Sequence, residues 1–200
     1  SFATPKENDY VLILTQDNSL WRLNPDDNTI KKIEVSFPNA VKIQSLAVYN
    51  RRLYTLDILN GQIYKHENNR DGFGLGKEWA KNDLDDLKTG IDLAIDGDIY
   101  ITHKDGHISK FTKGEKQQFS LNGLDPVLNN EAEIWTYNDT NIIYILDSAN
   151  RRLIVVNKDG LVQAQITASI LQSPVSFTIG DNSKQIYLLD QNKIYFFLLP

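Results

Sequence analysis

The 200-residue chain contains no cysteine and no methionine. Without cysteine it has no disulfide, no thiolate nucleophile and no cysteine-ligated metal. Long hydrophobic runs are also missing, since an apolar run such as 194–199 is strand-length and far shorter than a membrane span. We therefore predict a soluble protein that does not insert into a membrane. Because residue 1 is not methionine, we also expect this sequence to come from a longer chain with fused domains.

The sequence has no excess of basic residues. Lys and Arg number 21 against 26 Asp and Glu, which gives a net charge of −5 and a pI near 5.2. Proteins that bind nucleic acid usually carry a clustered basic surface. The charge balance therefore argues against nucleic acid as a partner.

What the sequence does contain is an internal repeat of two apolar runs joined by a tight polar turn. The second residue of the first run is Leu12, Tyr54, Tyr100, Tyr144 or Tyr187, with spacings of 42 to 46 residues. The second run opens at Leu20, Ile63, Ile108, Leu153 or Ile194, with spacings of 41 to 45. Two independent landmarks thus keep the same period through five units.

Each unit has the composition of β-hairpins. The runs are rich in Ile, Val, Leu, Tyr and Phe and are bounded by Asn, Asp and Gly. Complete units predict four strands, for example 133–137, 141–147, 152–157 and 161–167, whereas helical turns are expected only at 83–88 and 168–172. Four-stranded units of this length indicate an all-β fold, a β-propeller of about five blades with three to four antiparallel strands each. We expect one domain over 1–200, with blades near 1–35, 45–80, 91–121, 133–167 and 175–200.

The fourth unit carries a more specific pattern. Asp147, Asn150 and Arg152 precede an apolar strand and the turn Asp159-Gly160. This pattern resembles the NHL repeat, and the resemblance is sharpest over 141–167. It implies an NHL-like propeller, a family used mostly as a binding platform.

Two features concern the edges of the blades. The fifth unit has no fourth strand, so we expect 194–199 to be its outermost strand, covered by a segment from outside this sequence or by another molecule. The first strand is expected to close the ring by packing the first blade against the fifth. The glycine-rich segment 72–76 is predicted to be a turn between the third and fourth strands of the second blade.

Acidic side chains gather on one predicted face. Connectors between blades and turns between second and third strands share a face of a propeller, and more acids than bases fall in these segments. The candidate binding residues there are Asp83, Asp85, Asp86, Asp105, Asp125, Glu131 and Asp147. We expect Asp83, Asp85 and Asp86 to be exposed at its rim.

The central channel offers few chemical groups. Alignment of the innermost strands puts Ser45, Asp92, Ile134 and Ser176 at one equivalent position. Asp92 is then the one acid of this set, and Glu133 lies next to the channel entrance. A hydrolase would need two facing carboxyl groups, one with a raised pKa. We predict no catalytic residue and treat Asp92 and Glu133 as channel acids.

The three histidines give little indication of a metal site. His103 and His107 flank one hairpin turn and could be joined by Asp105, but turn histidines are usually solvated. We therefore predict no metal site and no cofactor.

These observations favour a non-catalytic binding module for a protein or peptide, which docks on the acidic loop face. The alternative is a channel-centred hydrolase of the glycosidase or metal-dependent lactonase type, since propellers host both kinds of function.

Overall fold

The strands form five separate sheets, which we call blades one to five in chain order. The computed structural model describes residues 2–3, 10–82, 84–180 and 185–198. Within these residues, the sheets of blades three, four and five consist of strands that are consecutive in the sequence. One strand that lies in the sequence of blade two joins the sheet of blade one instead.

The strand bounds follow the predicted repeat. Blade one contains β1 (Phe2–Ala3), β2 (Val11–Leu14), β3 (Leu20–Asn24), β4 (Thr29–Ser36) and β8 (Gly72–Leu75). Blade two contains β5 (Ile43–Tyr49), β6 (Arg52–Asp57), β7 (Gln62–His66) and β9 (Lys77–Glu78). Blade three contains β10 (Gly90–Ile95), β11 (Asp98–His103), β12 (Ile108–Thr112) and β13 (Glu115–Gln117). Blade four contains β14 (Ala132–Thr136), β15 (Ile142–Asp147), β16 (Arg152–Asn157) and β17 (Val162–Thr167). Blade five contains β18 (Pro174–Ile179), β19 (Gln185–Asp190) and β20 (Lys193–Leu198).

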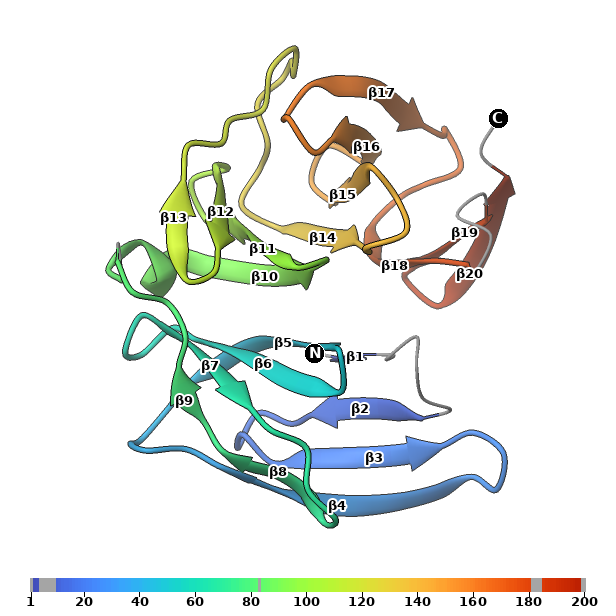
Figure 1. The fold of residues 1–200 in the computed structure, drawn as a ribbon. Helices are drawn as coiled ribbons and strands as arrows, with labels where there is room; N and C mark the ends of the chain where they lie inside the picture. The colour runs from blue at the N-terminus through green and yellow to red at the C-terminus, as the bar shows by residue number, and fades with distance from the viewer. Residues whose placement is uncertain (1, 4–9, 83, 181–184, 199–200) are drawn as a thin grey trace.

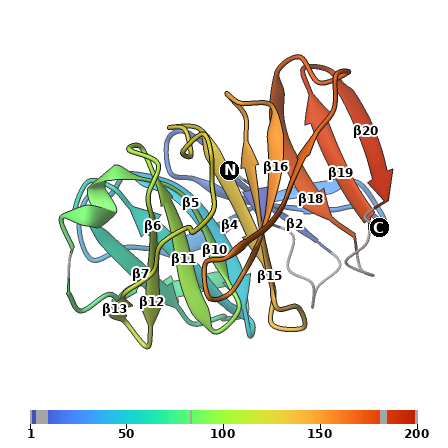
Figure 2. The ribbon, with the colours of Figure 1, turned by 90° about the horizontal axis from the view of Figure 1, so that it is seen from above.

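The blades are arranged around a common axis. Their first strands β1, β5, β10, β14 and β18 lie nearest the centre and contact one another in that order, while the later strands lie at the periphery (Figure 1). In the view at right angles, blade five lies on the opposite side of the molecule from blade three (Figure 2). This arrangement is a five-bladed β-propeller, and the predicted all-β class is confirmed.

Helical structure is almost absent, as expected. The 3₁₀ helix η1 (Asp86–Thr89) overlaps the predicted turn at 83–88, whereas 168–172 forms no helix. In the part of the chain that the structure describes, no helix has the length and apolar character needed to cross a membrane.

The hydrophobic core lies between the blades. Four clusters of buried side chains join blades one and two, two and three, three and four, and four and five. The recurrent Tyr54, Tyr100 and Tyr144 are buried in these interfaces.

The glycine-rich segment was predicted wrongly. Instead of a turn, Gly72–Leu75 forms β8, which pairs in parallel with β4 at the outer edge of blade one and buries Phe73 between blades one and two. The backbones approach so closely that a Cβ on Gly72 would lie 2.2 Å from the carbonyl oxygen of Glu34. Glycine is therefore required by the contact between the two strands.

Blade five has three strands, as predicted, and β20 is its outermost strand in the described residues. Its apolar side chains Ile194, Phe196 and Leu198 are exposed, and Tyr187 of β19 is 40% exposed. Among the described residues, no cluster of buried side chains joins blade one to blade five. Residues 4–9 and 181–184, which border this region in the sequence, lie outside them.

A buried polar group ends the second strand of blades two to five. The register pairs the first residue of each innermost strand with Asp57, His103, Asp147 or Asp190. Asp57 accepts a hydrogen bond from the backbone N–H of Lys42 at 2.9 Å, and Asp190 accepts one from Ser173 at 2.6 Å. Both donors lie in the connector that enters the blade. The group therefore fixes the connector to the end of the sheet.

In blade four an ion pair takes this role. Asp147 is fully buried and accepts hydrogen bonds from Asn150 and from Nε of Arg152. The guanidinium of Arg152 also donates to the carbonyl oxygens of Asp125, Pro126 and Val127 in the connector between blades three and four. The motif that resembles an NHL repeat thus has a structural function here.

Replacing Arg152 by methionine should lower the free energy of unfolding by about 3–5 kcal/mol, because Asp147 would be left as a buried charge without its partner. Urea unfolding followed by circular dichroism measures this change. The exposed neighbour Arg151 provides the control, and Arg151→Met should alter stability by less than about 0.5 kcal/mol. Equal effects of the two substitutions would contradict the anchoring role of Arg152.

Candidate functional site

Only some of the acidic residues predicted for the loop face are exposed. The side chains of Asp85, Asp105, Asp125 and Glu131 are exposed on it, and Asp83 lies outside the described residues. Asp86 was predicted to be exposed, but its side chain is only 21% exposed and pairs with Lys116. Asp147 cannot belong to a binding surface at all, because it is completely buried beneath Arg152.

The channel carboxylates lie closer together than the sequence alignment implied. The observed register makes Ser45, Asp92, Glu133 and Ser176 equivalent, because they face Leu56, Thr102, Leu146 and Leu189. The predicted alignment, which had Ile134 in this set, was therefore wrong by one residue. A β-bulge precedes the equivalent residue in blades two, three and five, whereas no irregularity interrupts the register of β14. The channel position thus holds two acids.

These channel groups connect successive blades. The hydroxyl of Ser45 donates to Asp92 at 2.6 Å, and Asp92 accepts the backbone N–H of Ile134 at 3.0 Å. Glu133 accepts the backbone N–H of Phe177 at 3.3 Å. Each link runs from the innermost strand of one blade to that of the next. Both acids therefore have a structural role at the axis.

The surroundings raise the pKa of both channel acids. Burial raises the pKa of Asp92. Burial and the negative charge of Asp92 raise the pKa of Glu133 from 4.5 to about 7. A protonated Glu133 beside Asp92 is the kind of pair that acid–base chemistry uses, but the same hydrogen bonds serve the contact between blades.

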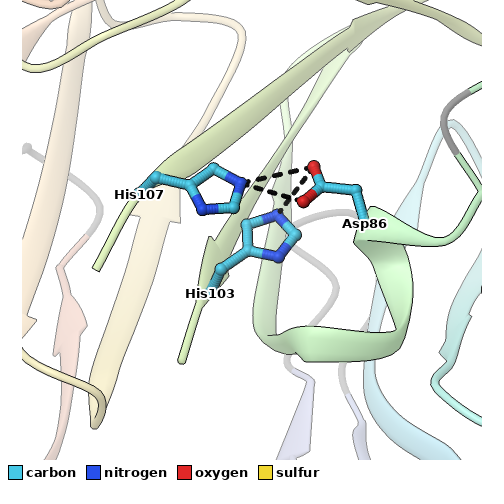
Figure 3. A group of neighbouring side chains, drawn as sticks. All are labelled: Asp86, His103 and His107. Carbon is cyan, nitrogen blue, oxygen red and sulfur yellow. Dashed lines mark hydrogen bonds and ion pairs between the residues drawn. The ribbon is translucent and has the colours of Figure 1, made fainter. Parts of the chain in front are cut away.

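Blade three departs from the other blades at the loop face. Where blade four has Asp147 paired with Arg152 and blade two has Asp57 with Gln62, blade three has His103 opposite His107. Their rings are stacked with centroids 4.0 Å apart. Asp86, at the start of η1 in the connector between blades two and three, lies against both rings (Figure 3).

The cluster of Asp86, His103 and His107 is compact. Nε2 of His107 lies 3.1 Å from Oδ1 of Asp86, and Nε2 of His103 lies 3.8 Å from Oδ2. Asp86 also accepts hydrogen bonds from the hydroxyl of Ser109 at 2.6 Å and from Nζ of Lys116 at 2.8 Å. Of the described residues, these three form a group whose ligand atoms all lie within 4.8 Å, close enough to hold one metal ion.

The environment keeps His103 neutral and Asp86 charged. Burial and the neighbouring His107 lower the pKa of His103 from 6.5 to about 4. Burial alone would raise the pKa of Asp86, but the hydrogen bonds from Lys116 and Ser109 bring it well below its ordinary value. At neutral pH the cluster therefore combines a carboxylate with an imidazole that carries a free lone pair.

The cluster opens to solvent on one side. His107 and Lys116 border an open cleft of about 630 Å³, which Phe119 and Asp159 also line. Access to the cluster is thus through His107, while His103 lies at its buried end.

Sequence reasoning missed part of this cluster. It noted His103 and His107 as neighbours but expected solvated rings and Asp105 as the third group. His103 is buried, and the acid that reaches both rings is Asp86. Asp105 instead lies 2.5 Å from Nδ1 of His107.

Comparisons with known proteins agree with the fold. No family model and no curated protein matches the chain. Among solved structures, a chain of a nidogen–laminin complex has a TM-score of 0.67 at 21% identity, with 90% of this chain and 70% of that chain covered. A streptogramin B lyase has a TM-score of 0.62 at 17% identity and coverage of 100% and 68%. Virginiamycin B lyase from Staphylococcus aureus has a TM-score of 0.60 at 16% identity, with 100% of this chain and 70% of that chain covered. At such identities the likeness shows the propeller architecture alone.

The raised pKa of Glu133 predicts a pH dependence of stability. The folded protein holds this proton up to about pH 7, whereas the unfolded chain loses it near 4.5. Stability from this group should therefore be present below pH 4.5 and decline as pH rises towards 7, by at most about 3 kcal/mol. Glu133→Gln should remove this decline.

Urea unfolding at a series of pH values from 4.5 to 8 measures the effect. Glu131→Gln is the matched control, because Glu131 is exposed two residues away, and it should retain the decline seen in the wild type. A decline of the same size in Glu133→Gln would contradict the assignment to Glu133.

Proposed function

We propose that the protein is an NHL-like propeller that acts as a non-catalytic binding module, and that it binds a protein or peptide with basic and apolar side chains on its loop face. The observation that carries this proposal is the connector between blades three and four. Arg152 holds three of its carbonyl groups, while the side chain of Val127 is 78% exposed. The connector thus holds an apolar side chain in solvent, and its burial by a partner would be favourable.

Other loops on this face also carry exposed apolar side chains. Leu59 lies in the turn between β6 and β7, and Leu84 and Ile170 lie in the connectors that enter blades three and five. All three side chains are exposed on the same face of a propeller as Val127. A partner with apolar side chains would bury this surface from water.

Charge favours a basic partner. Asp125 and Glu131 are exposed on the same connector as Val127. Asp85 and Asp105 are also exposed on this face, but they are paired with Lys88 and His107. Exposed charges of this kind increase the rate of association with a partner of opposite charge and lose strength as salt rises.

The hydrolase alternative is less well supported. Asp92 and Glu133 both accept backbone hydrogen bonds from the next blade, which accounts for their burial without a substrate. The lyase activities of the two similar propellers belong to those proteins, and their identity to this chain is too low to transfer chemistry.

Three synthetic peptides of equal length test the proposal: one of Lys and Leu, one of Glu and Leu, and one of Lys and Ser. Fluorescence anisotropy should show the tightest binding for the Lys–Leu peptide, because it alone matches both the acidic and the apolar groups. The Kd should rise by roughly tenfold between 50 and 300 mM salt, in the manner of screened charge pairs.

Variants then locate the binding surface. Asp125→Asn combined with Val127→Ser should weaken binding of the Lys–Leu peptide at least about fivefold, in keeping with loss of a contact residue. The matched control is Asp159→Asn with Leu161→Ser, an exposed acid and an exposed apolar residue at the turn between β16 and β17 on the opposite face. Equal loss in both variants, or no preference among the peptides, would contradict the proposed docking face.

A further inference from the structure

The histidine cluster in blade three contains a buried nitrogen atom without a hydrogen-bond partner. Nδ1 of His103 lies 2.9 Å from the hydroxyl oxygen of Thr89, whose own hydrogen is donated to the carbonyl of Asp86. When this hydroxyl donates to Asp86, Nδ1 of His103 carries the hydrogen and donates it to Thr89. This leaves Nε2 with a lone pair, and Nε2 is buried without a hydrogen-bond partner.

Such an unpaired buried atom has an energetic cost. A buried polar atom without a partner costs about 1–3 kcal/mol, and native proteins keep few of them. The corresponding aspartates in blades two and five receive hydrogen bonds from their connectors. In blade three the atom points instead towards Asp86, 3.8 Å away (Figure 3). A cation bound between Nε2 of His103 and Asp86 would accept the lone pair of this nitrogen.

His107 is oriented in the way that metal-bound histidines usually are. Its Nδ1 lies 2.5 Å from a carboxylate oxygen of Asp105, and its Nε2 faces Asp86. A carboxylate that receives the second N–H of a histidine fixes the ring and makes the other nitrogen a stronger ligand. Thr89 gives His103 the equivalent support. Both rings thus have their outer nitrogens engaged, and both Nε2 atoms lie beside Asp86, although the stacked rings would have to tilt apart for both lone pairs to meet one ion.

We propose that Asp86, His103 and His107 form a site for a zinc-class divalent transition metal, with three protein ligands and one open position. Two imidazoles and one carboxylate are ligands that Zn²⁺ prefers. Neighbouring ligands around a tetrahedral zinc are about 3.3 Å apart, given bonds near 2.0 Å. Oδ2 of Asp86 lies 3.3 Å from Nε2 of His107 and 3.8 Å from Nε2 of His103, which is close to this value. The open position faces the cleft beside His107.

Lys116 would compete with the metal. Its Nζ lies 2.8 Å from Oδ2 of Asp86 and is therefore a positive charge on a ligand atom. The side chain is partly exposed and borders the cleft, so it can swing into solvent when a cation binds. This contact predicts that removal of the lysine charge strengthens metal binding, an effect that a purely structural cluster would not show.

The test uses Co²⁺ absorption spectroscopy and Zn²⁺ titration calorimetry on the metal-free protein. The wild type should bind one equivalent, and Co²⁺ should give the visible absorption of a tetrahedral complex. His107→Gln and Asp86→Asn should each weaken binding by at least about a hundredfold, whereas Lys116→Gln should strengthen it by about three- to tenfold.

His103 is buried, so its substitution is left out of the primary comparison and folding of every variant is checked by circular dichroism. Asp98→Asn is the matched control: Asp98 lies in the same blade and pairs with Lys110 at 3.1 Å, but it contacts no histidine. It should bind metal as the wild type does. Absence of a tetrahedral Co²⁺ spectrum, or equal affinities of the wild type and His107→Gln, would overturn the proposal. Either result would leave the peptide-binding proposal untouched, because that test uses other residues.

Discussion

The loop face of this propeller depends on one buried polar group at the end of the second strand in blades two to five. Connectors expose backbone N–H and C=O groups, and these must be paired where they cross a buried sheet end. Asp57 and Asp190 accept connector N–H groups directly, while Asp147 acts through Arg152, which binds connector carbonyls. The connectors that enter blades two, four and five are therefore held in fixed positions although they contain no helix or strand.

Both proposed functions are variations on this arrangement. In blade four the anchored connector presents Val127 and Asp125 to solvent. In blade three His103 replaces the acid and His107 replaces its partner, and the connector contributes Asp86 instead of a backbone donor. An arrangement shared by blades two to five thus supports a contact surface in one place and a group of ligand atoms in another.

The sequence predicted the repeat well because packing between blades requires apolar residues at a constant period. Strands of blade four, for example, begin and end within one residue of the prediction. It failed where a single residue changes the register or where distant segments meet. The missing bulge in β14 moved Glu133 to the channel position, and β8 pairs with a strand nearly forty residues earlier. The helical turn at η1 was predicted, but the contact of Asp86 with His103 joins a connector to the end of a strand, which no local pattern indicates.

The most direct test of this account is a crystal structure of the protein grown with Zn²⁺, with anomalous diffraction recorded on both sides of the zinc absorption edge. The account predicts one strong anomalous peak in blade three, about 2.0–2.2 Å from Nε2 of His103, Nε2 of His107 and a carboxylate oxygen of Asp86, with Lys116 moved away from Asp86. Crystals with no anomalous peak at this cluster, and with Lys116 still bound to Asp86, would contradict it.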